Sequence, residues 1–146
     1  MLNKINSPQE CRDECKPLVF IAEDEPILRQ LIVKLLPKEW IIEEFGTGES
    51  LIERAKAKLP DLIISDFRLP GITGVEMMSQ LRAANATMPV IFISGYAGKQ
   101  DIIEFIKLGA YSFFDKPFDQ KEFKTCAEDA IKHWSYIKTL QQQESL

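Results

Sequence analysis

The chain reads LVFIAEDEP from Leu18 to Pro26: five apolar residues, three acids and a proline. A short apolar run of this kind predicts a buried strand. The proline suits the first turn of a helix, where its missing N–H would have no partner in any case. Three other apolar runs lead in the same way into polar residues, which are Asp66 after Leu62-Ile63-Ile64-Ser65, Ser94 after Val90-Ile91-Phe92-Ile93, and Lys116 after Tyr111-Ser112-Phe113-Phe114-Asp115.

Segments with helical periodicity alternate with these runs, and a further strand is expected at Ile41–Phe45. Five strand and helix pairs of this kind predict an α/β fold, with a doubly wound five-stranded parallel sheet and helices on both faces. The second helix is expected at Ser50–Lys58, and the last helix begins with Asp119 and Glu122 in capping-box spacing. The first helix is expected to bury Ile27 among its apolar residues, and the fourth to bury Ile102, Ile103, Phe105 and Ile106 before a Gly109 cap.

The polar residues at the strand ends should lie close together, because the carboxyl ends of parallel strands meet at one edge of the sheet. Glu23, Asp24 and Asp66 would then share a small volume with Ser94 and Lys116. Carboxylates this close repel one another, and a hard divalent cation such as Mg²⁺ relieves the repulsion through oxygen ligands. The sequence therefore predicts a magnesium-assisted phosphoryl acceptor.

Length and composition restrict the other classes. With 146 residues, 45% hydrophobic and 27% charged, the chain has the composition of one globular domain. A net charge of −4 argues against a general nucleic-acid surface and favours protein partners. With no long apolar run and no signal pattern, we expect a cytoplasmic protein without a membrane partner. The cysteines show no zinc-site spacing, so Cys11 and Cys15 are expected to be free thiols, with a redox pair as the alternative.

The ordered set resembles the receiver domain of bacterial two-component response regulators, the phosphoacceptor partners of histidine kinases. The resemblance covers about Pro17 to Trp134 and includes the motif Lys116-Pro117-Phe118. The separations along the chain support it: 42 residues from Asp24 to Asp66, 28 from Asp66 to Ser94 and 22 from Ser94 to Lys116. It implies a flavodoxin-like sheet with strand order 2-1-3-4-5.

By this resemblance Asp66 is the nucleophile that becomes an aspartyl phosphate. Asp24 and Asp66 would bind Mg²⁺ directly, Glu23 would act through a water, and the backbone carbonyl of Arg68 would be a further ligand. Mn²⁺ is expected to substitute for Mg²⁺. The protein would then be a signalling phosphoacceptor rather than an enzyme, limited to self-catalysed phosphoryl transfer and slow autodephosphorylation.

The same resemblance gives roles to residues around the nucleophile. Lys116 and Ser94 would contact phosphoryl oxygens, and a cis peptide bond before Pro117 would orient Lys116. Movement of Ser94 would rotate Phe113 inward as an aromatic switch, and Tyr96 and Arg68 would control water access. Plain packing of Phe113, and ordinary surface positions for Tyr96 and Arg68, remain as alternatives.

Three other functions are alternatives to this one. A dehalogenase-like phosphatase would need an acid two residues after the nucleophile, where Arg68 stands. Flavin binding would need a phosphate loop after the first strand, where Glu23, Asp24 and Glu25 would repel a phosphate. The principal alternative is a pseudo-receiver, a binding module with the same fold and no phosphorylation.

The expected organisation is a flexible arm at 1–16, a receiver domain at 17–136 and a helical extension or tail at 137–146. Ile137 and Leu140 should overhang the core on the last helix. Expected partners are a histidine kinase or phosphotransfer protein, and either a downstream protein or an effector domain outside this chain, without direct nucleic-acid binding. A weak homodimer through the fourth and fifth helices is expected to strengthen on phosphorylation.

Overall fold

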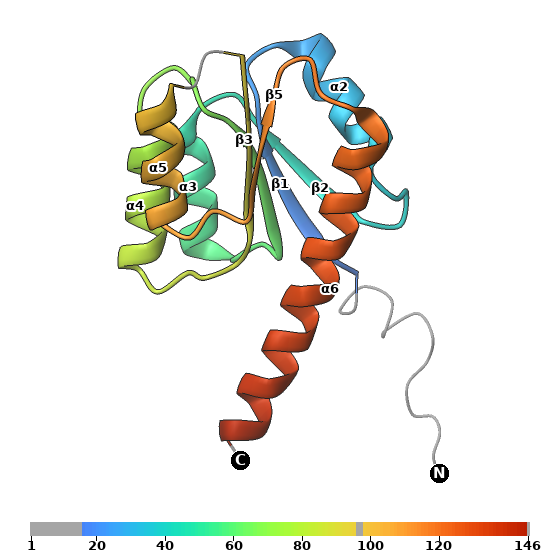
Figure 1. Ribbon diagram of the computed structural model, residues 1–146. Helices are drawn as coiled ribbons and strands as arrows, with labels where there is room; N and C mark the ends of the chain where they lie inside the picture. Colours follow the sequence, from blue (N-terminus) through green and yellow to red (C-terminus); the bar gives the residue numbers. More distant parts are fainter. Residues whose placement is uncertain (1–15, 96–97, 146) are drawn as a thin grey trace.

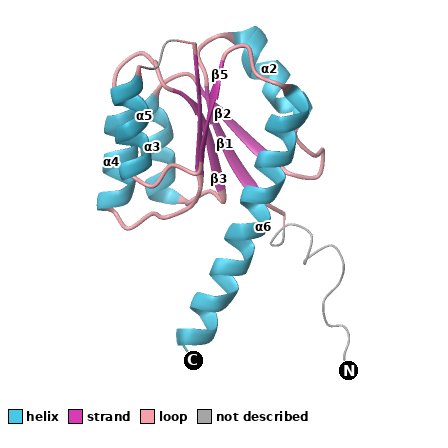
Figure 2. Cartoon of the chain, viewed as in Figure 1, coloured by secondary structure: helices cyan, strands magenta, loops and turns pink. Residues whose placement is uncertain are grey.

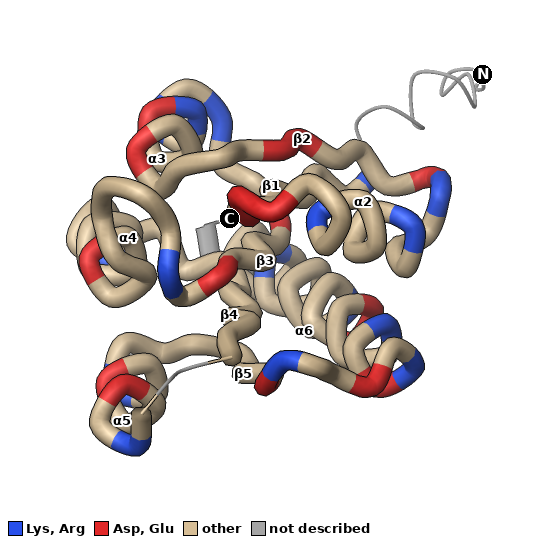
Figure 3. The backbone as a smooth tube through the Cα atoms, turned by 90° about the horizontal axis from the view of Figure 1, so that it is seen from above, with Lys and Arg blue, Asp and Glu red and all other residues tan. Residues whose placement is uncertain are grey.

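A parallel five-stranded sheet forms the centre of the protein. The computed structural model describes residues 16–95 and 98–145, apart from the side chains of 143–145. The strands lie in the order β2-β1-β3-β4-β5 (Figures 1 and 3), as predicted. Their bounds are β1 Leu18–Ala22, β2 Ile41–Phe45, β3 Leu62–Asp66, β4 Val90–Ser94 and β5 Ser112–Asp115.

Helices cover both faces of the sheet. Figures 2 and 3 show α3, α4 and α5 on one face and α2 and α6 on the other. The bounds of the helices are α2 Pro26–Leu35, α3 Gly48–Ala57, α4 Gly74–Ala83, α5 Lys99–Lys107 and α6 Gln120–Ser145. Every residue of β1, β3 and β4 is buried, as expected for the inner strands of a sheet covered on both faces.

Side chains alternate between two cores because successive residues of a strand face opposite ways. Phe20, Ile63 and Phe92 pack on the side of α3, α4 and α5. Their neighbours Ile21, Ile64 and Ile93 pack on the side of α2 and α6. None of the helices in the described part of the chain is long and apolar enough to span a membrane.

Local sequence signals set the helix ends. Thr47 Oγ1 accepts a hydrogen bond from Ser50 N at 3.2 Å, so α3 begins at Gly48 rather than at the predicted Ser50. Asp119 Oδ1 accepts from Glu122 N at 2.9 Å, as the predicted capping spacing requires. Gly109 has a left-handed φ of 81° after α5, which confirms the predicted glycine cap.

Two helices bury less of their apolar surface than predicted. Ile27 is 78% exposed because it lies in the first turn of α2, next to the exposed Pro26. On α5 only Phe105 is fully buried, with Ile106 69% and Ile103 36% exposed. The large ring of Phe105 fills the space between α5 and the sheet. Because adjacent residues of a helix point about 100° apart, Ile106 then points outward.

The last helix continues past the sheet. It buries Phe123, Ala127 and Ala130, whereas Ile137 and Leu140 are each 42% exposed. Figure 1 shows its C-terminal part projecting beyond the amino edge of the strands. The predicted overhang is confirmed, and the expected boundary between 136 and 137 falls inside one continuous helix.

Candidate functional site

The carboxyl edge of the sheet brings together the predicted polar residues. Glu23 follows β1, Asp66 and Ser94 are the last residues of β3 and β4, and Lys116 follows β5. Figure 3, which looks onto this edge, shows acidic segments at the ends of β1 and β3. The parallel topology therefore assembles the site from segments far apart in sequence.

The Asp66 carboxylate lies at the centre of this group and is only 7% exposed. Oδ2 pairs with Lys116 Nζ at 2.8 Å, and Oδ1 accepts a hydrogen bond from Arg68 N at 3.0 Å. Both oxygens therefore have a donor, which meets the requirement for a buried carboxylate.

Glu23 is even more deeply buried, at 1% exposure. Its Oε2 accepts from Glu25 N at 3.1 Å, and its Oε1 lies 3.5 Å from Lys116 Nζ. Burial raises the pKa of Glu23 from 4.5 to about 7, with a further increase from Asp66, against the opposing effects of Glu25 N–H and Lys116. The site therefore holds more negative charge than its one ammonium neutralises.

Lys116 is held by its own segment. Its peptide bond to Pro117 is cis, as expected from the resemblance, and Lys116 N donates to Ser94 O at 3.0 Å. Burial disfavours the charged ammonium, but the hydrogen bond to Asp66 and the charges of Glu23 and Asp66 outweigh burial and raise the pKa of Lys116. The raised pKa favours the charged ammonium at the site.

Glu23, Asp24 and Asp66 fit a divalent cation. One carboxylate oxygen from each lies within 4.8 Å of the others, and Asp24 is exposed, so the cluster opens to solvent on one side. An all-oxygen donor set suits Mg²⁺ or Mn²⁺. Arg68 contacts this cluster through its N–H on Asp66, and the metal role of its carbonyl stays a prediction.

A cavity of about 540 Å³ opens beside Asp66. It is lined by Glu25, Asp66, Arg68, Ser94, Gly95, Lys116 and Pro117. Ser94 is 1% exposed and stands between Asp66 and the segment that carries Lys116. The cavity gives a small tetrahedral group access to the carboxylate.

Phe113 belongs to a cluster of aromatic rings under this edge. The ring of Phe105 stacks on Phe92 at 4.1 Å and on Phe113 at 5.6 Å, and Phe67 meets it edge-on at 5.1 Å. Phe113 is half-buried against this core, and Phe67 directly follows Asp66. Tyr96, the other predicted switch residue, lies outside the described residues.

Arg29 was missed by the sequence analysis. Its Nη1 donates to Glu23 O at 2.8 Å, directly behind the acidic cluster. The sequence signal for this contact was an arginine near the start of a helix that follows an acidic loop. An arginine that only faces solvent has the same sequence pattern, so the signal was not specific.

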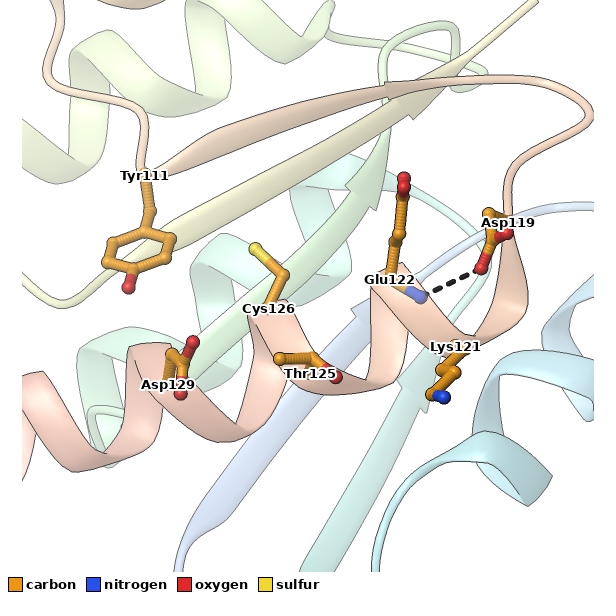
Figure 4. Close-up of a pocket in the computed structure, with 7 residues that line it drawn as sticks. All are labelled: Tyr111, Asp119, Lys121, Glu122, Thr125, Cys126 and Asp129. Carbon is orange, nitrogen blue, oxygen red and sulfur yellow. Dashed lines mark hydrogen bonds between the residues drawn. The ribbon is translucent and has the colours of Figure 1, made fainter.

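A second cavity of about 540 Å³ lies between β5 and α6 (Figure 4). Its lining residues are Tyr111, Asp119, Lys121, Glu122, Thr125, Cys126 and Asp129. Asp119 is already used as a helix cap, and burial raises the pKa of the Cys126 thiol, which keeps it protonated. The carboxylates of Glu23, Asp24 and Asp66 converge at the carboxyl edge, so that edge and not this second cavity is the candidate site. Cys126 is free, and Cys11 and Cys15 lie outside the described residues.

Comparison with known proteins agrees with this geometry. The family model described as the response regulator receiver domain matches residues 19–128. The chain therefore belongs to the receiver domains of two-component response regulators, a signalling rather than a catalytic family.

Curated relatives are longer proteins. The DNA-binding transcriptional regulator NtrC of Escherichia coli K12 is 26% identical over 118 residues, which are 80% of this chain and 25% of NtrC. Hybrid signal transduction histidine kinase D of Dictyostelium discoideum is 31% identical over 109 residues, 73% of this chain and 7% of the kinase. The chain thus spans a quarter or less of these two relatives.

Solved structures share the fold. The signal receiver domain of an HD domain-containing protein from Pseudomonas fluorescens Pf-5 has a TM-score of 0.79 at 19% identity, covering 85% of this chain and 93% of the other. A CheY-like receiver domain protein from Methanospirillum hungatei has a TM-score of 0.77 at 17% identity, covering 83% and 98%.

Proposed function

We propose that Asp66 is the phosphoacceptor of a two-component phosphorelay and reacts in a Mg²⁺-dependent step with a phosphohistidine of a kinase or phosphotransfer protein. One arrangement carries the proposal. The Asp66 carboxylate lies 2.8 Å from Lys116 Nζ, has acidic oxygens of Glu23 and Asp24 within 4.8 Å, and faces a cavity.

In the proposed step a carboxylate oxygen of Asp66 attacks phosphorus in line with the leaving group. The new O–P bond forms an acyl phosphate, and the P–N bond to the donor imidazole breaks. The imidazole nitrogen keeps the electron pair and takes up a proton. Lys116 and Ser94 then donate to phosphoryl oxygens, which stabilises the charge on the transferring group.

The proposed Mg²⁺ ligands are Asp24, Asp66 and the Arg68 carbonyl, with Glu23 acting through a water and Mn²⁺ as a substitute. The cation offsets the charge of the carboxylates and of the incoming phosphoryl group. Glu23 supports this assignment, because its burial beside Asp66 is costly for an anion that must share the Lys116 ammonium with Asp66.

The phosphoryl state is proposed to switch protein contacts. Ser94 would move toward the phosphoryl group and Phe113 would follow, carried by its stacking on Phe105. Tyr96 and Arg68 would limit water access and keep autodephosphorylation slow. The proposed location is the cytoplasm.

Output would go to a downstream protein or to an effector domain outside this chain. NtrC is described as a DNA-binding transcriptional regulator, and the chain matches a quarter of its length. We assign no nucleic-acid contact to the chain itself. The exposed Ile137 and Leu140 support a weak homodimer that phosphorylation strengthens through α5 and α6.

Treatment with acetyl phosphate and Mg²⁺, followed by intact mass measurement, tests the proposal. One added phosphoryl group is expected in the wild type, none in Asp66→Ala, and little in the wild type with EDTA. Asp115→Ala, which removes an exposed carboxylate at the end of β5, is the matched control and should still be modified. A wild type that gains no mass would instead identify a pseudo-receiver, and a gain that persists in Asp66→Ala would overturn the site.

A further inference from the structure

Arg29 links three segments behind the acidic cluster. It lies in the first turn of α2, with a side chain 27% exposed. Its Nη1 donates to the backbone carbonyl of Glu23 at 2.8 Å, and its Nε donates to Glu44 Oε1 at 3.0 Å. One guanidinium therefore joins α2, the end of β1 and strand β2.

The backbone carbonyl of Glu23 accepts from Arg29 because β2 ends before it can supply an N–H donor to this carbonyl. Glu23 N still donates to Phe45 O at 3.1 Å, which continues the parallel ladder beyond Ala22. In a parallel ladder the carbonyl of the same residue would next accept from the neighbouring strand two residues after Phe45. That residue is Thr47, but the chain has already turned there and Thr47 caps α3. The Arg29 guanidinium takes the place of the absent strand N–H.

Three hydrogen bonds consequently fix the chain at Glu23. They are the bond from Glu23 N to Phe45 O, the bond from Arg29 Nη1 to Glu23 O, and the bond from Glu25 N to Glu23 Oε2. The carbonyl that Arg29 holds belongs to the peptide unit that joins Glu23 to Asp24. The orientation of that peptide sets where the exposed Asp24 carboxylate lies relative to Asp66.

The Glu44 carboxylate compensates the charge of Arg29. A guanidinium this near would otherwise oppose the binding of a cation. Arg29 Nε pairs with the Glu44 carboxylate, so the guanidinium already has an anionic partner. Arg29 can therefore donate a hydrogen bond to the Glu23 carbonyl while Glu44 of β2 offsets its positive charge.

We propose that Arg29 is a positioning residue for the cation site, which holds the Glu23–Asp24 peptide so that both carboxylates face Asp66 before a cation binds. This inference rests on the proposed metal-dependent function. Arg29 itself does not touch the cation. Groups that orient metal ligands in this way typically change metal affinity by about 10-fold or more when removed.

Mn²⁺ titration followed by the electron paramagnetic resonance signal of the free ion tests the proposal directly. Arg29→Gln is expected to bind Mn²⁺ about 10-fold more weakly than the wild type. Arg29→Lys keeps the positive charge and an N–H donor, so its Mn²⁺ affinity should fall less. If Arg29→Gln does not fold, the affinity of Arg29→Lys is the measurement that tests the proposal. In the metal-free protein the Asp24 amide should exchange with solvent faster in Arg29→Gln.

The matched control is the Arg54–Glu43 pair, which joins the same strand to α3 with contacts of 2.7 and 3.0 Å. Arg54→Gln should keep Mn²⁺ affinity and Asp24 exchange close to the wild type. Wild-type affinity in Arg29→Gln, or an equal loss in Arg54→Gln, would overturn the positioning role.

The outcome is separable from the proposed function. At saturating Mg²⁺, the control Arg54→Gln should reach the same extent of phosphorylation as the wild type, because Asp66, Lys116 and the segment held by Arg29 are intact. If the wild type itself takes up no phosphoryl group, the phosphoacceptor proposal fails while the Mn²⁺ affinities still decide the role of Arg29.

Discussion

At the scale of single residues, Glu23 is an unfavourably placed carboxyl, because burial disfavours its charged form. Its carboxyl is buried beside Asp66 and shares Lys116 with it. Burial raises its pKa to about 7, so protonation and cation binding are alternative ways to remove the same excess charge. The stability of the metal-free protein should therefore depend on pH through this residue.

The sign of that dependence follows from the raised pKa of Glu23. Between pH 4.5 and about 7 the folded chain holds a proton that the unfolded chain has released. The stabilisation is complete below the unfolded pKa and is lost as pH rises through the folded pKa. In EDTA, the free energy of unfolding by urea should fall by on the order of 2 kcal/mol more in the wild type than in Glu23→Gln between pH 5 and pH 8.

Saturating Mg²⁺ should shrink this difference, because the cation binds the charged form and competes with the proton. Parallel pH profiles for the wild type and Glu23→Gln in EDTA would contradict the assignment of a raised pKa to Glu23.

At the scale of elements, α6 is fixed by contacts at both ends of the sheet. Phe123 and Ala127 pack it into the core, and Lys138 pairs with Asp61 beyond the point where the sheet ends. The other oxygen of Asp61 accepts from Leu18 N at 2.9 Å, at the start of β1. Asp61 therefore ties the overhanging part of the helix to the amino edge of the sheet.

Asp61→Asn should loosen that overhang, because the amide keeps an acceptor for Leu18 N but loses the charge that pairs with Lys138. Amide hydrogen exchange of residues 138–142 is expected to become faster, with a global loss of about 0.5–1 kcal/mol for a partly exposed pair. Glu53→Gln removes an exposed ion pair of α3 with Lys56 and serves as the control. Unchanged protection at 138–142 in Asp61→Asn would show that core packing alone holds the helix.

At the scale of the whole molecule, the overhanging helix exposes Ile137 and Leu140, which the proposed second copy would cover. Sedimentation velocity should show a largely monomeric protein that shifts toward dimer with Mg²⁺ and beryllium fluoride, a stable phosphoryl mimic. Ile137→Asp should abolish the shift, because it places a charge on the apolar side of the helix. Ser135→Asp, about 200° away around the helix, should not. A monomer under all conditions would leave this surface without the proposed role.

Local sequence patterns predicted the strands, their order along the chain and the residues that cluster at the candidate site, although not the contact of Arg29. Apolar runs that end in Glu23, Asp66, Ser94 and Lys116 are local patterns, and the parallel topology turns that order into proximity. The end of α5 and the start of α6 were also predictable from local sequence, because Gly109 and Asp119 each cap the adjoining helix.

How these elements fit together could not be predicted from the sequence, because it depends on contacts between distant segments. The exposure of Ile27 depends on its place in the first turn of α2, and that of Ile106 on the space that Phe105 fills. The link between Asp61 and Lys138 joins residues 77 apart in the chain. The contact of Arg29 with the Glu23 carbonyl depends on where β2 stops pairing with β1. The apolar periodicity of a sequence predicts which residues share a face of one element. It does not predict which groups of different elements meet, so such contacts follow from packing and not from sequence pattern.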